Sequence, residues 1–425
     1  MIYIIASHSN RLEYVCRQIF NRWLGVEFEI CQQNDFKADA NDAVINYSNS
    51  IVDNALNIAP CGLLHQQGIT NVYPEWKEEH LFPTECELGF DIFSAVFYLI
   101  SRYEEYGENA TDKHGRYKQE NSTLFKQGLL QTPVVDKWTE EFRLFINDKF
   151  KIGIPKHTPI NLTTVDVDNV YAFRNKGIIR HILSSVKDLV NGNRQDILKR
   201  WKTLFHVEDD PFFNIEEVSQ RLADETPDNV IFFHCGCYGK FDKKTIFPSL
   251  RYWKAKQKIA KQIVVGLHIS YRAATNDTAL KLEKWILGKC LGRAVTRCRF
   301  HYLKFALPYG YERLEKFGFT DDYSMAYSDM AGYRAGTSKP FSFYNIEKEN
   351  ETKLTVHPLI VMDKTLRSNM KLSVDAAYEY IDSLKKESNA TGGDFTTLFH
   401  NENIADLDGW KKWGEKFFEK EQQTL

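Results

Sequence analysis

The chain has 425 residues, 43% hydrophobic and 14% aromatic, which is enough apolar material for two or three domains with large cores. The formal net charge is −2, and the interspersed charges give no sign of a nucleic-acid-binding stripe or a polybasic membrane patch. No apolar run reaches the ~18 residues needed to span a bilayer, and residues 1–7 lack the features of a secretory signal. The eight scattered cysteines are typical of reduced thiols, so a cytoplasmic location is expected.

The first part of the chain alternates short strands and helices, as a small α/β domain does. Strands are expected at residues 1–6, 26–31 and 43–47, and a helix at 11–20. A longer helix is predicted to begin after Asp91, a good N-cap residue, because apolar residues follow it at helical spacing. No catalytic constellation is evident in this part, and its role stays open.

Two prolines and a glycine interrupt residues 152–159, which predicts a boundary between an N-terminal α/β domain, residues 1–155, and a second domain, residues 156–425. Beyond it, strands and helices alternate, which favours a parallel sheet, open or closed into a barrel. Strands are expected at 230–235, 263–269, 294–302, 354–361 and 395–400, and helices at 177–190, 196–205, 279–289, 311–317 and 374–386. A further helix should begin at Asn214, in a capping box with Glu217.

Polar residues stand at the ends of four predicted strands of the second domain. These endings are Asp166-x-Asp168, His268-x-Ser270, Arg299-x-His301 and His400. Residues two apart on a strand leave the same face, and the carboxyl ends of parallel barrel strands meet at one rim. Each ending alone has a structural alternative: Asp168-Asn169 can turn the chain, and a histidine after an apolar run can be a satisfied core residue. Four such endings together favour a shared site.

These residue types support metal-assisted hydrolysis. A divalent ion held by one carboxylate and two imidazoles keeps positions open for water and a substrate carbonyl. Such an ion can lower the pKa of bound water from ~16 to ~7, which at ~1.36 kcal/mol per unit is ~12 kcal/mol of ionisation free energy. A second carboxylate can take the proton of the water, and a histidine opposite can protonate the leaving amine.

At these positions, over about residues 158–425, the chain resembles the polysaccharide deacetylases of carbohydrate esterase family 4, and divergent bacterial members with an N-terminal extension in particular. Thr164-Val165-Asp166-Val167-Asp168 is similar to one form of the first family motif, T-F-D-x-D. The resemblance implies a distorted (β/α) barrel, with Asp166 as the catalytic base and Asp168 as a ligand of a divalent metal. Zinc is the metal expected, with cobalt and nickel as alternatives.

The second family motif, H-[ST]-x-x-H, is only half kept. The chain has His268 at the first ligand position but Arg272 at the second, and an arginine repels a cation instead of binding it. Arg299 fits the arginine of the third motif, which orients the base. We expect His301, two residues further on and on the same face, to supply the missing imidazole.

The remaining motifs add further candidate residues. A G-[FY]-x-x-D-x-S segment similar to the fourth motif contains Asp322, which is expected to be catalytic, and the fifth motif makes His400 the general acid. Arg334 stands in a Gly-rich loop, where it either binds an anionic substrate group or belongs to a tight surface loop. Tyr271 and Arg272 are further expected substrate contacts.

Together these features predict a metal-dependent hydrolase that removes an N-acetyl group from an acetamido sugar, or a related amide, of cell-surface glycan metabolism. Because no signal peptide is evident, an intracellular precursor is favoured over a finished polymer as the carbohydrate substrate. Arg272 keeps a second hypothesis open, in which the barrel has lost its metal and binds glycans without catalysis. A hydrolase of non-sugar amides on the same fold is the third hypothesis.

Overall fold

The computed structural model describes residues 1–32, 43–107, 109–174, 176–190, 192, 194–242 and 249–405. The chain forms two compact units, each made of three segments. The first comprises Met1–Asn161, Phe305–Ile360 and Glu379–Thr396, and the second comprises Leu162–Lys304, Val361–Tyr378 and Thr397–Leu425. The domain boundary between residues 155 and 156 stays a prediction.

The first unit contains a four-stranded parallel sheet in the order β2–β1–β3–β4. Its strands are β1 (Ile2–Ile5), β2 (Phe28–Cys31), β3 (Ala43–Tyr47) and β4 (Leu56–Ile58), and its helices include α1 (Asn10–Cys16), α2 (Ile92–Ile100) and α4 (Val134–Phe150). The predicted start of α2 is confirmed, because the carboxylate of Asp91 accepts a hydrogen bond from the backbone amide of Ser94 at 3.0 Å.

The first unit also contains a three-stranded group that the sequence did not predict as a whole. β12 (Phe341–Asn345) pairs antiparallel with β13 (Asn350–Pro358), and β13 pairs in parallel with β11 (Asp321–Met325). No strand was predicted at β12, which differs from its neighbours in pairing antiparallel. The short polar connection between Asn345 and Asn350 allows a direct return of the chain, and a hairpin needs no crossover helix.

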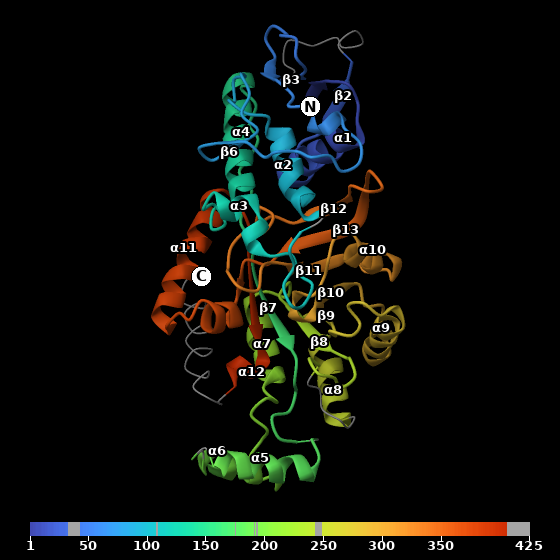
Figure 1. The fold of residues 1–425 in the computed structure, drawn as a ribbon, viewed down its shortest axis with the longest axis vertical. Helices are drawn as coiled ribbons and strands as arrows, with labels where there is room; N and C mark the ends of the chain where they lie inside the picture. Colours follow the sequence, from blue (N-terminus) through green and yellow to red (C-terminus); the bar gives the residue numbers. More distant parts are fainter. Residues whose placement is uncertain are drawn as a thin grey trace. The chain divides into compact units, whose positions relative to one another are not determined.

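The second unit contains six strands in the order β10–β9–β8–β7–β15–β14, which curl into part of a barrel (Figure 1). They are β7 (Asn161–Val167), β8 (Val230–His234), β9 (Val264–Ile269), β10 (Arg297–Phe300), β14 (Val361–Met362) and β15 (Phe395–His400). β7 to β10 pair in parallel, because helices such as α8 (Leu250–Ile259) and α9 (Asp277–Leu291) return the chain between them. The predicted α/β class with a barrel-type sheet is confirmed.

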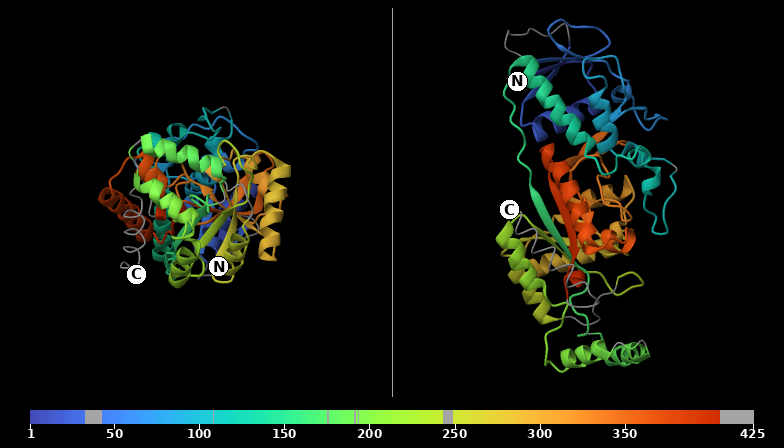
Figure 2. Two further views of the ribbon diagram at one scale, coloured as in Figure 1. Left: turned by 90° about the horizontal axis from the view of Figure 1, so that it is seen from below. Right: turned by 90° about the vertical axis from the view of Figure 1, so that its left-hand side faces the viewer.

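A helical insertion follows β7, as predicted. It comprises α5 (Ile178–Val190), α6 (Arg194–Leu204) and α7 (Ile215–Glu225), with α5 and α6 side by side (Figure 2). The capping box at Asn214 is wrong, because its side chain caps nothing and instead donates to the carbonyl of Asn401 at 3.0 Å. Asn214 thus bonds to a residue distant in sequence instead of to the first turn of its own helix.

Candidate metal centre

The parallel register of the second unit brings the polar strand ends to one edge. His268 of β9 stands opposite His234 of β8. Asp166 of β7 pairs two positions before His234, so Asp168 reaches the level of both histidines. Asp168, His268 and His301 each place a potential ligand atom within 4.8 Å of the others.

His268 is buried, and its two ring nitrogens face different partners. Nδ1 lies 3.2 Å from the carbonyl oxygen of Arg299, which can only accept, so Nδ1 carries the hydrogen. The lone pair on Nε2 then faces Oδ1 of Asp168 at 3.1 Å and Oδ2 of Asp166 at 3.5 Å. Neither this nitrogen nor Oδ1 of Asp168 has a hydrogen-bond partner. Buried polar atoms without partners are rare, and electron-rich atoms that face one another favour a cation between them.

His301 turns its Nε2 towards the same carboxylate, 3.5 Å from Oδ2 of Asp168. Its Nδ1 donates to Oδ1 of Asp242 at 3.0 Å. Burial opposes protonation of His301, but the carboxylates of Asp168 and Asp242 outweigh it and raise its pKa to about 10. Burial likewise opposes ionisation of Asp168, yet the charge of His301 counters it and holds the pKa of Asp168 well below the usual range. A metal ion would therefore displace a proton from His301 on binding.

The ligand set fits a small divalent cation such as zinc. Zinc binds carboxylate oxygens and imidazole nitrogens at about 2.0–2.1 Å, so the ligand atoms of a tetrahedral site lie about 3.3 Å apart. The separations are 3.1 Å from Oδ1 of Asp168 to His268 and 3.5 Å from Oδ2 of Asp168 to His301, each close to this value. One carboxylate and two imidazoles would hold the ion and leave a position open for a substrate.

Asp242, which no sequence motif indicated, holds the second imidazole in place. Its Oδ1 accepts hydrogen bonds from the Tyr271 amide at 2.8 Å and from Nδ1 of His301 at 3.0 Å, and lies 3.2 Å from Nε2 of His234. Burial alone would raise the pKa of Asp242, but the hydrogen bonds from both histidines lower it below the usual range. A carboxylate on the far nitrogen of a ligand histidine fixes its tautomer and orientation. His234, Asp242 and His301 also form a second group of potential ligands.

The expected base, Asp166, is buried beside these ligands and is held by Arg299. Nη1 of Arg299 donates to Oδ1 of Asp166 at 2.9 Å, and Nη2 donates to the hydroxyl of Thr164 at 2.9 Å. The guanidinium carbon lies 4.6 Å from the ring centroid of Phe232. A Cβ on Gly266 would come within 2.5 Å of that ring, so glycine leaves the space that the ring needs. These contacts fix the carboxylate of Asp166, with its Oδ2 directed towards the candidate metal ligands.

The expected general acid, His400, stands at the end of β15 beside a buried aspartate that sequence motifs did not indicate. Nδ1 of His400 lies 2.7 Å from Oδ1 of Asp363, and the side chain of Asn403 donates to Oδ2 of Asp363 at 2.8 Å. Burial opposes protonation of His400, but Asp363, with smaller contributions from Asp168 and Asp166, raises its pKa to about 9. The imidazole is therefore protonated at neutral pH, as a proton donor must be.

Arg272, at the position where the family has a ligand, lies in a turn after β9 with its side chain exposed. Tyr271 packs against the rings of Phe241 and Tyr302, with centroid separations of 4.3 and 5.7 Å, and the Lys304 ammonium lies 3.8 Å from its ring centroid. The roles of Tyr271 and Arg272 as substrate contacts stay predictions.

Asp322 and Arg334 belong to the first unit and have partners there. Asp322 is buried and accepts hydrogen bonds from the Tyr311 hydroxyl at 2.8 Å and from the amide and hydroxyl of Ser324 at 2.9 and 2.7 Å. Arg334 is also buried, and its Nε and Nη2 donate to Glu105 at 2.9 and 2.6 Å. These contacts favour a structural role for Arg334, and a functional role of either residue stays a prediction.

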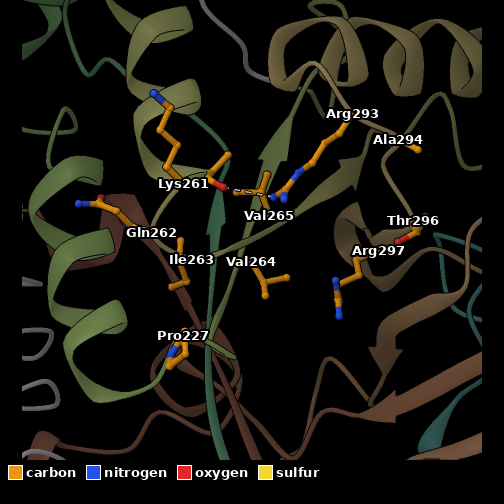
Figure 3. A pocket seen from close by; sticks show the side chains of 11 residues that line it. Pro227, Lys261, Gln262, Ile263, Val264, Val265, Arg293, Ala294, Thr296 and Arg297 are labelled. Carbon is orange, nitrogen blue, oxygen red and sulfur yellow. Dashed lines mark hydrogen bonds between the residues drawn. The ribbon is translucent and has the colours of Figure 1, made fainter.

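A pocket of about 320 Å³ opens at the opposite ends of the strands, where β9 and β10 begin (Figure 3). Its lining includes Lys261, Arg293 and Arg297, and Arg293 donates to the carbonyl of Ala260 at 3.4 Å. Catalytic residues of parallel barrels lie at the carboxyl ends of the strands. This pocket is therefore separate from the candidate metal centre.

Comparison with known proteins matches parts of the chain. The model of a family of unknown function, DUF7033, matches residues 1–151. No curated protein matches the sequence. A protein assigned as a polysaccharide deacetylase from Mycobacterium smegmatis is 12% identical over 63% of this chain and 85% of its own, with a TM-score of 0.39.

Two further solved structures are similar to the chain. Puue allantoinase is 12% identical over 62% of this chain and 84% of its own, with a TM-score of 0.38. The polysaccharide deacetylase Bc1974 from Bacillus cereus is 11% identical over 62% of this chain and 89% of its own, with a TM-score of 0.27.

Proposed function

We propose that the second unit is a metal-dependent hydrolase that removes an N-acetyl group from an acetamido sugar or a related amide. The observation that carries the proposal is the pair of facing buried atoms, Oδ1 of Asp168 and Nε2 of His268, which lie 3.1 Å apart without hydrogen-bond partners. His301 approaches the same carboxylate from the next strand. The acetamido sugar as substrate rests on the resemblance of the motifs around Asp166 and His400.

The residues divide the work of hydrolysis between them. A divalent ion, when bound, would polarise the substrate carbonyl and acidify a water molecule. Asp168, His268 and His301 would hold this ion, while Asp242 keeps the lone pair of His301 Nε2 directed at it. Asp166 takes a proton from the attacking water. Its ion pair with Arg299 fixes the carboxylate in the position that this transfer needs.

Departure of the amine needs a second proton transfer. His400 is protonated at neutral pH and gives its proton to the leaving nitrogen. Asp363 holds Nδ1 of His400 at 2.7 Å and stabilises the charged ring, so the other nitrogen, Nε2, is the donor. The acid and the base thus come from different strands, β15 and β7.

Metal analysis separates this hydrolase from the two other hypotheses. Protein stripped with a chelator and then supplied with zinc, cobalt or nickel should bind one equivalent and release acetate from N-acetylated hexosamines, free or in oligosaccharides. Asp168→Ala should lose both the metal and the activity. Wild-type protein that binds no metal under these conditions would instead favour a glycan-binding barrel. Metal binding with turnover of non-sugar amides alone would favour the third hypothesis.

The pH dependence of catalysis tests the role of His400. Because its pKa is raised to about 9, the ring is protonated below that pH and loses its proton above it, so kcat should fall as the pH rises through about 9. Asp363→Asn removes the carboxylate that raises the pKa, so the alkaline limb of the kcat profile should move down by at least about one unit, towards the ordinary value near 6.5. Asp375→Asn, at an exposed position, is the control. An unchanged alkaline limb in Asp363→Asn would assign the acid to another group.

A further inference from the structure

Helix α5 presents an apolar face to solvent. Six of its large apolar side chains are at least half exposed: Ile179, Ile182, Leu183, Val186, Leu189 and Val190. Their spacing of three and four residues places them on one side of the helix. Large contiguous apolar surfaces are rare on proteins that have no partner, so this face indicates an interaction site.

The opposite, polar side of α5 is the side that packs against α6. His181 is buried, and its carbonyl accepts a hydrogen bond from Nη1 of Arg200 at 3.3 Å. Nη2 of Arg200 also pairs with Asp188 of α5 at 2.5 Å. A surface helix of a soluble protein buries its apolar face and exposes its polar face. In α5 the polar side is packed and the apolar side is exposed, so these apolar residues do not contribute to a core.

Helix α6 and the residue after it also carry exposed apolar side chains. Leu198 is 63% exposed and Phe205 is 72% exposed. Trp201 lies between them at helical spacing and stacks on Phe205, with ring centroids 6.0 Å apart. The view from below in Figure 2 shows α5 and α6 side by side as a pair of short helices. Both helices thus carry exposed apolar side chains.

The charge of the hairpin differs from that of the whole chain. The span of the two helices, residues 178–204, contains six Lys and Arg and two Asp, whereas the whole chain has 55 Lys and Arg against 57 Asp and Glu. Of these cations, Arg200 is ion-paired with Asp188 and Lys202 with Glu208. Lys187, in the last turn of α5, and Arg194, the first residue of α6, are both exposed. The hairpin is therefore a basic segment within a chain whose charges are nearly balanced.

We propose that the α5–α6 hairpin binds the surface of an anionic lipid bilayer. A helix with an apolar face and basic flanks lies in the bilayer interface, where the apolar side chains enter the acyl boundary and the cations meet lipid phosphates. At 1.5 Å per residue, the 13 residues of α5 extend about 20 Å, too short for a hydrocarbon core of about 30 Å. Among the described residues, no helix is long and apolar enough to cross a membrane. The hairpin would therefore lie on the bilayer.

Charge favours a bilayer over a second copy of the chain. In a symmetric dimer through this face, two hairpins of the same positive net charge would face each other and repel. An anionic lipid surface instead attracts each nearby Lys or Arg by about 1 kcal/mol. This proposal does not depend on the proposed hydrolysis, because it rests only on the hairpin.

Vesicle co-sedimentation of the full-length chain tests the proposal. The protein should sediment with vesicles of phosphatidylcholine containing about 30% phosphatidylglycerol, and less with phosphatidylcholine alone or when the salt rises from about 0.1 to about 0.5 M. Leu183→Asp combined with Val186→Asp should lower the partition coefficient at least about ten-fold. Lys187→Glu combined with Arg194→Glu should lower it by a similar factor on anionic vesicles only.

A matched pair of control substitutions distinguishes binding through the hairpin from non-specific hydrophobic binding. Leu144→Asp with Leu250→Asp changes two exposed leucines outside the hairpin and should leave sedimentation unchanged. Thermal melting should be the same for all variants, and Ile179→Ser with Leu189→Ser provides a milder second pair. The proposal is overturned if wild-type protein does not bind anionic vesicles, or if the control pair loses binding equally. A wild-type dimer that only the hairpin variants dissociate, without vesicle binding, would assign the face to a second copy.

Discussion

Asp166→Asn is expected to lower kcat for amide hydrolysis by about 10²–10⁴-fold while the protein keeps one equivalent of zinc. The substitution removes the proton acceptor but preserves the size of the side chain. Zinc should stay bound because the three proposed ligands, Asp168, His268 and His301, are unchanged. Acetate release and zinc content measured on the same sample give both results at once.

The control for this experiment is Asp209→Asn, at a side chain that is 77% exposed. It changes the charge by the same amount outside the candidate centre, so its kcat should match that of the wild type. Nearly full activity in Asp166→Asn would show that another group is the base. Loss of zinc would show that Asp166 is itself a ligand. This is the main alternative, because Oδ2 of Asp166 lies only 3.5 Å from Nε2 of His268.

His301→Ala is expected to weaken zinc binding by more than about 100-fold, because it removes a ligand and not merely a supporting hydrogen bond. Asp242→Asn should have a smaller effect, about 10–100-fold, since it alters only the partner of Nδ1. Arg272→Ala should bind zinc as tightly as the wild type, because its side chain is exposed. Competition with a chromophoric chelator at constant pH measures all three affinities.

The order of these three zinc affinities tests whether His301 replaces the ligand histidine that is absent at position 272. If His301→Ala bound zinc like the wild type, the second imidazole would have to come from His234, which shares Asp242 with it. His234→Ala is therefore the matched variant, and it should retain at least the affinity of Asp242→Asn. A strong effect of Arg272→Ala would mean that the turn after β9 supports the centre in a way its exposure does not indicate.

The positions of the strand-end residues were predictable because two regular patterns coincide. The period of two places Asp166 and Asp168 on one face, and parallel pairing brings successive strand ends to the same edge. The proximity of His268 and His301 followed from these rules once both were assigned to neighbouring strands. A separate local rule gave the start of α2 at Asp91, where an N-cap sets the boundary.

Residues that depend on long-range contacts or irregular loops were not predictable. Asp242 and Asp363 lie outside the regular strands that carry their histidine partners, so no period places them beside His301 and His400. The α5–α6 hairpin was expected as helices, but its exposed apolar face depends on which side packs against α6. An amphipathic pattern gives two faces and does not say which one is buried.

β10 pairs with β9 so that Arg299 lies opposite His268, and this register positions two parts of the candidate centre at once. Both Arg299 and His301 come from β10 and the residue that follows it, on one face. A shift of β10 by a single position would turn both side chains to the other face. Ion capture and orientation of the base would then disappear in one event, so a misaligned chain could not retain half of the chemistry.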